Sequence, residues 1–367
     1  MRPMLSTTNK LLLLLALLLL LGLPKSSRAE PYLAMEMGLK CVACHVNPTG
    51  GALRNATGLA FAKGAIPANQ LPEMMSNWNG GIGEALRIGG DLRTSLQRSQ
   101  VPDQPTQNAA GLDQFRVYGD MQLIPDRLGV YVDDTLAPGN AQVQEAYVRT
   151  SLPGMAWYAK AGQFYLPFGW RLQDNTAFVR TTSGISMTTP DKGVELGMEQ
   201  GDWSVQVDLT NGVGNAGTGQ GHQLTTQAIW VQPWGRVGAA ATSTSSPGGN
   251  RQVAGLFGGL RTGPLVWLAE ADLVSDASFP EGRRRMLASL LEVDWLVHRG
   301  HNLKLTGETY DPDRRVANDN EARYSLVYEY TPIPFLQVRA GYRRYLGIPQ
   351  NNLQNRQLEF LELHGYF

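Results

Sequence analysis

Two cysteines and a histidine near the start of the chain form the strongest chemical motif in the sequence. They are Cys41, Cys44 and His45, in the order C-x-x-C-H. This spacing is that of a c-type haem attachment site. Two thiols on one turn form thioethers with the haem vinyl groups, and the adjacent imidazole of His45 reaches the iron as the proximal ligand. The motif therefore predicts one covalently bound haem c, with His45 as its metal ligand.

Three other interpretations of the motif are weaker. A C-x-x-C redox pair requires a βαβ context and a lowered thiol pKa, and the surrounding residues indicate no such fold. A zinc site needs four ligands, and the sequence has no second cysteine pair. A plain disulfide between Cys41 and Cys44 would leave His45 unexplained.

Residues 1–29 have the anatomy of a secretory signal peptide. Arg2 and Lys10 give the positive start, an apolar run from Leu11 to Leu23 follows, and Ala29 ends a small-residue exit. Cleavage there, rather than retention as a membrane anchor, leaves 28 basic and 32 acidic residues, a net charge of −4. Export agrees with haem c attachment, which bacteria carry out outside the cytoplasm. Nothing in this charge balance indicates a nucleic-acid partner.

Residues 30–80 are predicted to be a small α-helical haem segment, with a short helix that ends at Gly64. About 50 residues are too few for a self-sufficient core. We therefore expect this segment to borrow a wall from the rest of the chain.

Residues 81–367 alternate with a period of two, which indicates strands rather than helices. In the stretch from Glu321 to Thr331, for example, Tyr324, Leu326 and Tyr328 face one way and charged residues face the other. After residue 29 no apolar run approaches the roughly 18 residues of a membrane helix. We count about 16 strands, near 84–97, 112–124, 127–133, 143–151, 156–164, 191–200, 203–211, 221–232, 236–244, 251–261, 264–274, 284–297, 301–310, 320–331, 335–345 and 355–367.

The connections between these strands are short and long in strict turn, which is typical of an outer-membrane barrel with periplasmic turns and external loops. The longest connection, 165–190, is predicted to be an external loop. The predicted fold is all-β, a transmembrane antiparallel barrel of about 16 strands with a small helical haem segment. An even number of strands puts both ends in the periplasm, and Phe367 gives the last strand a terminal aromatic residue.

The distal haem ligand stays open, since methionine and histidine are both usual in cytochromes c. Met35, Met37, Met74 and Met75 are near the motif in sequence. Three histidines of the barrel region, His298, His301 and His364, are predicted at its periplasmic rim and are further candidates.

The motif and the barrel together resemble the fused cytochrome–porins of the outer membrane, known from iron-oxidising bacteria. The resemblance covers the mature chain in architecture and rests on Cys41, Cys44, His45 and the stretch from Asn55 to Phe61. A second stretch, Gly162 to Gly169, is similar to phosphate-selective-type porins and implies a barrel lineage only.

The resemblance implies electron transfer across the outer membrane, with the haem segment in the periplasm or in the barrel lumen. An extracellular redox substrate such as ferrous iron, a periplasmic cytochrome or other carrier and outer-membrane lipid are the expected partners. Iron-oxidising oxidoreductase activity is open, and so is the oligomeric state. The alternative is a solute-conducting porin in which the haem segment is a plug or a gate. A haem-dependent catalyst such as a peroxidase would need distal acid–base groups, which no sequence element marks.

Overall fold

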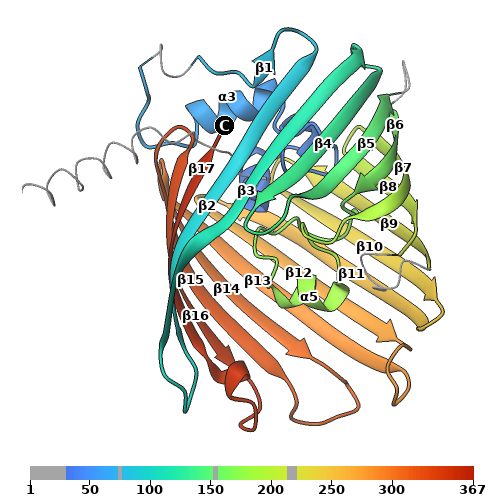
Figure 1. Ribbon diagram of the computed structural model, residues 1–367, viewed down its shortest axis with the longest axis vertical. Coiled ribbons are helices and arrows are strands. Elements are labelled where there is room, and N and C mark those ends of the chain that lie inside the picture. Colours follow the sequence, from blue (N-terminus) through green and yellow to red (C-terminus); the bar gives the residue numbers. More distant parts are fainter. Residues whose placement is uncertain (1–29, 73–76, 152–155, 213–220) are drawn as a thin grey trace, which may run out of the picture.

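The computed structural model describes residues 30–72, 77–151, 156–212 and 221–367. Within them the chain forms a closed antiparallel barrel with a helical segment at one mouth (Figure 1). The predicted signal peptide, Met74 and Met75 lie outside the described residues.

Sixteen strands of the described chain build the barrel, as the alternation predicts. They are β2 (Leu86–Gln100), β3 (Gln107–Ile124), β4 (Leu128–Ala137), β5 (Gln142–Ser151), β6 (Trp157–Phe164), β7 (Asp191–Gln200), β8 (Trp203–Thr210), β9 (His222–Gln232), β10 (Gly235–Ser246), β11 (Gly249–Thr262), β12 (Leu265–Asp276), β13 (Arg284–His298), β14 (His301–Asp311), β15 (Glu321–Ile333), β16 (Leu336–Leu346) and β17 (Gln357–Tyr366). Each strand pairs with the next, and β17 pairs with β2, which closes the barrel. A two-residue strand, β1 (Gly81–Ile82), pairs with the start of β2.

Helices are short and few in the described residues. They are α2 (Pro31–Met37), the 3₁₀ turn η1 (Cys41–Ala43), α3 (Ala56–Gly64), α5 (Phe178–Ser183) and the 3₁₀ turn η2 (Asn352–Asn355). None of the helices described is both long and apolar enough to cross a membrane.

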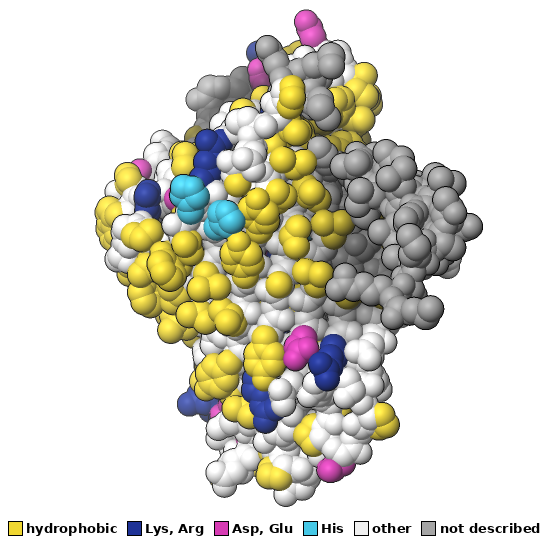
Figure 2. Space-filling view, turned by 90° about the vertical axis from the view of Figure 1, so that its left-hand side faces the viewer, with side chains coloured by type: hydrophobic (Ala, Val, Ile, Leu, Met, Phe, Trp, Pro, Cys, Tyr) yellow, Lys and Arg dark blue, Asp and Glu magenta, His cyan; other side chains and the backbone are white. Residues whose placement is uncertain are grey.

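The alternation places apolar side chains on the outside of the barrel and polar ones inside. Along β10, buried and exposed residues follow each other almost without a break. Leu256 on β11 is 68% exposed, whereas Asp208 on β8 and Asp272 on β12 are fully buried in the interior. Hydrophobic side chains cover much of the outer surface in Figure 2. This polarity is the reverse of a soluble protein and matches a barrel surrounded by lipid.

Residues 30–72, called the N-terminal segment from here on, lie in the barrel mouth at the end of the short turns (Figure 1). Their polar contacts reach strands around the barrel. Asn47 donates to Glu145 of β5, Lys40 to the Trp203 carbonyl of β8, Tyr32 to Glu329 of β15, Arg236 of β10 to the Leu39 carbonyl, and Lys304 of β14 to Glu30. The segment therefore packs against the barrel wall instead of around a core of its own, as its length predicts.

Residues 165–190, called the inner loop, fold into the lumen, so the prediction of an external loop is wrong. Helix α5 of this loop contacts β12, β13 and β14. The reason is that the loop matches the interior in both polarity and charge. Phe168 and Trp170 are buried against barrel residues. Arg180 pairs with Glu270 of β12, and Asp174 accepts a hydrogen bond from Arg323 of β15 at 2.9 Å.

The chain ends on the seam where β17 meets β2. The backbones of Phe367 and Gly90 exchange two hydrogen bonds of 3.3 Å. A Cβ atom at Gly90 would lie 2.5 Å from the Phe367 ring, so the terminal aromatic residue packs directly on the glycine. The same ring lies 6.3 Å from that of Trp78, between centroids. The seam therefore depends on the absence of a side chain at position 90.

We expect Gly90→Leu to lower the free energy of unfolding of the barrel by about 1–3 kcal/mol, because the added side chain displaces Phe367. Gly111→Leu on β3 is the matched control, since a Cβ atom there meets no atom within 4 Å. Urea unfolding in detergent, followed by tryptophan fluorescence, measures the difference. Equal midpoints for the two variants would show that Phe367 does not secure the seam.

Candidate haem-attachment site

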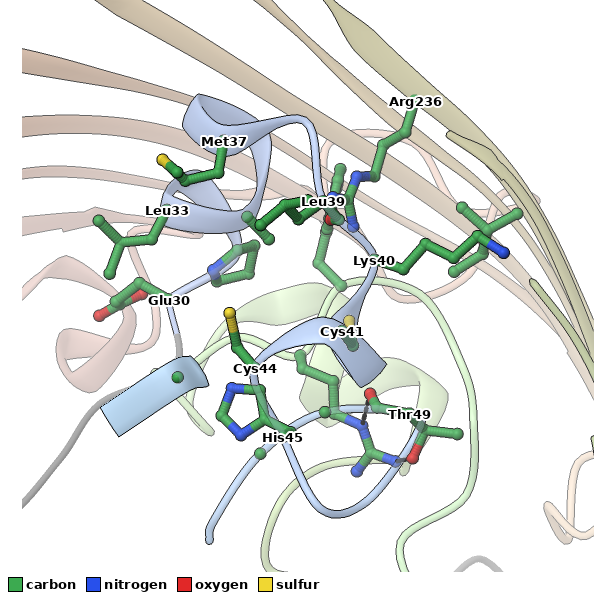
Figure 3. Close-up of a pocket in the computed structure, with 18 of the residues that line it drawn as sticks. Glu30, Leu33, Met37, Leu39, Lys40, Cys41, Cys44, His45, Thr49 and Arg236 are labelled. Carbon is green, nitrogen blue, oxygen red and sulfur yellow. Dashed lines mark hydrogen bonds between the residues drawn. The ribbon is translucent and has the colours of Figure 1, made fainter. Parts of the chain in front are cut away.

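The C-x-x-C-H motif forms one tight turn. Residues Cys41–Ala43 make the 3₁₀ turn η1, and the backbone N–H groups of Cys44 and His45 both donate to the Cys41 carbonyl, at 3.1 and 3.0 Å. Both thiols are free and partly exposed. Figure 3 shows the Cys44 thiol and the His45 ring on the same side of the turn.

Asn55 fastens this turn to helix α3. Its side-chain oxygen caps the helix by accepting from the Gly58 N–H at 2.9 Å. Its side-chain nitrogen donates to the carbonyls of Val42 and Ala43, at 3.1 Å each. Its backbone N–H donates to the Cys44 carbonyl at 3.0 Å. One side chain therefore both starts the helix and fixes the backbone that carries the two thiols.

Glycine lets the surrounding chain approach the cysteines closely. A Cβ atom at Gly58 would lie 2.1 Å from the Cys44 carbonyl oxygen, so α3 lies directly against the turn. Gly50, at a φ of 89°, turns the chain back beneath the motif, and a Cβ atom there would lie 3.2 Å from the Cys41 sulfur. The return brings Arg54 opposite His45 in a β-bridge.

The motif lines a cavity with about 850 Å³ of space between atoms, counting the part that is open to solvent. Part of its lining comes from the N-terminal segment, including Leu33, Met37, Lys40, Arg54 and Phe61. The inner loop contributes Trp170 and Arg171, and the strands β9, β10 and β11 contribute Ile229, Arg236 and Phe257. The cavity is therefore shared between the short segment and the barrel.

The His45 side chain is only 7% exposed and has the character of a neutral ligand. Loss of hydration lowers the pKa of His45 to about 3, and the nearby Arg54 guanidinium acts in the same direction. The ring is therefore uncharged near neutral pH, which is the form that binds metals. Its Nδ1 atom is buried without a hydrogen-bond partner.

Burial also affects the thiols, and its effect on Cys44 argues against a redox-active thiol pair. It raises the pKa of the Cys44 thiol, although Arg54 partly offsets this effect. A redox-active thiol needs a lowered pKa, because the thiolate is the reactive form. Among the described residues no three His, Cys, Asp or Glu side chains gather in a metal-binding group. The donor set of two thiols and one neutral imidazole on one cavity fits a haem c.

The structure separates the candidates for the distal ligand. Met37 lines the cavity, whereas Met35 is buried against the barrel wall, with its methyl group near Gly259. Met74 and Met75 lie outside the described residues.

The three histidine candidates do not line the cavity. His298 is exposed, and its neighbour across the turn, His301, stacks on the Tyr330 ring at 4.5 Å. Strand alternation turns His301 outward, because the next residue, Asn302, is buried in the interior. His364 does face inward, as predicted, and its Nε2 atom lies 3.2 Å from Asp91.

Several residues that line the cavity could not be predicted from the sequence. Arg54, Arg171, Arg236, Trp170 and Phe257 belong to four separate parts of the chain. No local motif connects them, since only the inward fold of the inner loop and the closure of the barrel bring them together.

The barrel is similar in fold to solved outer-membrane proteins. OmpT of Vibrio cholerae, folded in vitro, is 12% identical, with a TM-score of 0.60 over 78% of this chain and 99% of that chain. An anion-selective porin of Comamonas acidovorans is 10% identical, with a TM-score of 0.60 over 77% and 99%. The outer-membrane channel DcaP of Acinetobacter baumannii is 12% identical, with a TM-score of 0.56 over 77% and 97%.

These similarities define the chain as a porin-like β-barrel of 16 strands. No protein-family model matches the sequence, and no curated protein does so either. At 10–12% identity the likeness concerns the fold alone.

We expect Gly58→Val to separate α3 from the Cys44 backbone and to increase the reactivity of the two thiols toward a maleimide in the haem-free protein. Gly64→Val, at the end of the same helix, is the matched control, because a Cβ atom there meets nothing within 4 Å. Rates of alkylation of Cys41 and Cys44 measure the change. Rates that are the same in the two variants would contradict the close packing of α3 on the motif.

Proposed function

We propose that this chain is a bacterial outer-membrane cytochrome–porin with one haem c, which carries electrons between an extracellular donor or acceptor, such as ferrous iron, and periplasmic carriers. The observation that carries the proposal is the position of the motif. Cys41, Cys44 and His45 line a single cavity inside the mouth of a barrel whose outer surface is apolar.

The barrel supports an outer-membrane location. Its exterior is apolar and its lumen is polar, as in barrels of that membrane. Tight turns alternate with longer connections at every place but one, because the predicted longer connection at 245–250 is a two-residue turn, 247–248, between β10 and β11. The solved structures with a similar fold include a porin and a channel of outer membranes. In such barrels the short turns face the periplasm. The motif at that end would then face periplasmic carriers.

Each residue of the site would have a separate role in binding the cofactor. A haem c, when bound, would supply a one-electron couple. Cys41 and Cys44 would tether it, and the neutral His45 ring would ligate its iron. Asn55 keeps the turn in place, and Trp170 and Phe257 form part of the apolar lining of the cavity. Such burial and ligation are what set a haem potential.

A second cavity adjoins the first within the lumen. Glu30 lines both cavities, and the second one, with about 410 Å³ of space between atoms, is lined by charged side chains such as Asp174, Glu292, Lys304 and Arg323. The charged side chains that line it pair with one another, as Lys304 does with Glu292 at 3.5 Å and Arg323 with Asp174 at 2.9 Å.

A solute-conducting porin is the second candidate, and the fold favours it. A barrel of 16 strands is wide enough for an aqueous channel, and the anion-selective porin of Comamonas acidovorans shares the fold. The contents of the lumen weigh against free passage. The N-terminal segment contacts strands around the mouth, and the inner loop contacts the opposite wall from within.

We expect the protein purified from cells that attach haem c to carry one haem that stays bound after the protein is denatured. The double variant Cys41→Ser, Cys44→Ser is expected to lose all covalent haem, because both thioethers are then absent. Ala43→Ser, which leaves the motif intact, is the matched control. A peroxidase-based haem stain of a denaturing gel measures the outcome. Haem retained by the double variant would contradict attachment at this site.

An assay in proteoliposomes distinguishes electron transfer from solute conduction. We expect ferrous iron outside the vesicles to reduce cytochrome c enclosed within them, and the cysteine double variant to abolish this reduction. We also expect low ion conductance in planar bilayers, because the lumen is filled. High conductance with no reduction of the enclosed acceptor would favour the solute porin.

A further inference from the structure

Four carboxylates surround one ammonium group in the lumen, next to the cavity at the motif. The ammonium group belongs to Lys304 of β14, and these five residues are called the Lys304 cluster from here on. The distances from the Lys304 Nζ atom are 3.2 Å to Glu30, 3.5 Å to Glu292, 3.9 Å to Asp294 and 4.0 Å to Glu329. All five residues are buried. The cluster joins the start of the N-terminal segment to the strands β13, β14 and β15.

The cluster has more negative charge than its cations balance. Arg339 lies 3.0 Å from one of the four carboxylates, but it is also 3.5 Å from Glu362, which is outside the cluster. The neighbouring Arg323 and Arg343 both pair with Asp174, at 2.9 and 2.8 Å. In the described chain the four carboxylates therefore have ion pairs with two basic groups, one of them shared. Buried carboxylates in such an excess are unfavourable unless a further cation is present.

The cluster also has fewer hydrogen-bond donors than acceptors. Asn302 donates to Asp294 at 2.8 Å and to Glu329 at 3.1 Å. Even so, the second carboxylate oxygen of Asp294, Oδ2, is buried without a hydrogen-bond partner in the described chain, and so is the side-chain oxygen of Asn302. Asp294 is fully buried and Asn302 is 4% exposed. A primary ammonium group would supply what the cluster lacks, because it has a positive charge and three N–H donors.

Removal of the predicted signal peptide creates such a group at Glu30. Hydrolysis of the peptide bond between Ala29 and Glu30 uses one water and leaves a carboxylate on Ala29 and an amino group on Glu30. An α-amino group is mostly protonated at neutral pH. The mature chain therefore has a cation that the precursor does not have.

The position of Glu30 places this new cation at the cluster. Glu30 is 4% exposed and lines both cavities of the lumen. Its carboxylate contacts Lys304, and the α-amino group is attached to the Cα atom from which that side chain extends. Figure 3 shows Glu30 beside α2, with its carboxylate pointing away from Cys44. The new charge is therefore formed beside the acidic cluster.

We propose that cleavage before Glu30 supplies the missing cation, and that the α-ammonium group of Glu30 binds the carboxylates of the Lys304 cluster. Processing then has a structural role besides the removal of the export signal. It fixes the first residue of the N-terminal segment to the wall formed by β13, β14 and β15, and so helps to hold the segment in the barrel mouth. This role does not depend on a bound haem.

The test measures the rate at which the α-amino group of the mature protein reacts with an N-hydroxysuccinimide ester at neutral pH. Mass spectrometry of the N-terminal peptide identifies the first residue and the labelled fraction. The reagent needs an unprotonated amine, and neighbouring carboxylates stabilise the protonated form. We expect labelling of the folded protein in detergent to be at least about tenfold slower than labelling of the same protein unfolded in urea.

Variants distinguish the effect of charge from that of burial. Asp294→Asn and Glu292→Gln each remove one negative charge with little change in size, so each is expected to make labelling of the folded protein faster. The second variant serves if the first does not fold. Asp208→Asn on β8 is the matched control, because it removes another buried carboxylate of the lumen from a strand that is not adjacent to β13, β14 or β15. Its labelling rate is expected to equal that of the unchanged protein.

Three results would overturn the proposal. They are equal labelling rates in the folded and unfolded protein, unchanged rates in the folded cluster variants, and a mature chain that does not begin at Glu30. None of them bears on the attachment of haem at Cys41 and Cys44, which a haem stain of the same samples measures separately.

Discussion

The pairing of β17 with β2 is the constraint on which the rest of this molecule depends. Closure removes both sheet edges and turns the polar side of every alternating strand inward. The interior then has to be filled or hydrated, because charged side chains such as Asp208 and Asp272 point into it. The N-terminal segment and the inner loop meet this demand with their own charges and hydrogen bonds. The cavity at the motif exists because these two pieces meet against the wall.

The C-x-x-C-H turn is a simple local structure, and its buried surroundings determine the protonation states of its side chains. A tight turn, one asparagine and one close glycine contact place two thiols and an imidazole together. Burial then keeps the His45 ring neutral and the Cys44 thiol protonated. Four basic side chains against one carboxylate give the cavity an excess of positive charge. If the proposed haem is bound, the same burial would contribute to setting its potential.

Much of the barrel could be predicted from the sequence, because alternation, tight turns and the aromatic end are local patterns. The sixteen predicted strands correspond to β2–β17. The position of the inner loop could not be predicted, because it depends on partners such as Glu270, which is 90 residues from Arg180. The cysteines and His45 could be found by their spacing. Arg54 and Arg236 could not, since 182 residues separate them and only closure unites them.

The central claim is that a porphyrin is bound by thioethers inside the barrel mouth. Intact mass spectrometry of the protein purified from bacterial outer membranes tests it most directly. The account predicts a chain that begins at Glu30 and carries the added mass of one haem. A chain of unmodified mass would contradict it, and so would a purified protein with no visible absorption band.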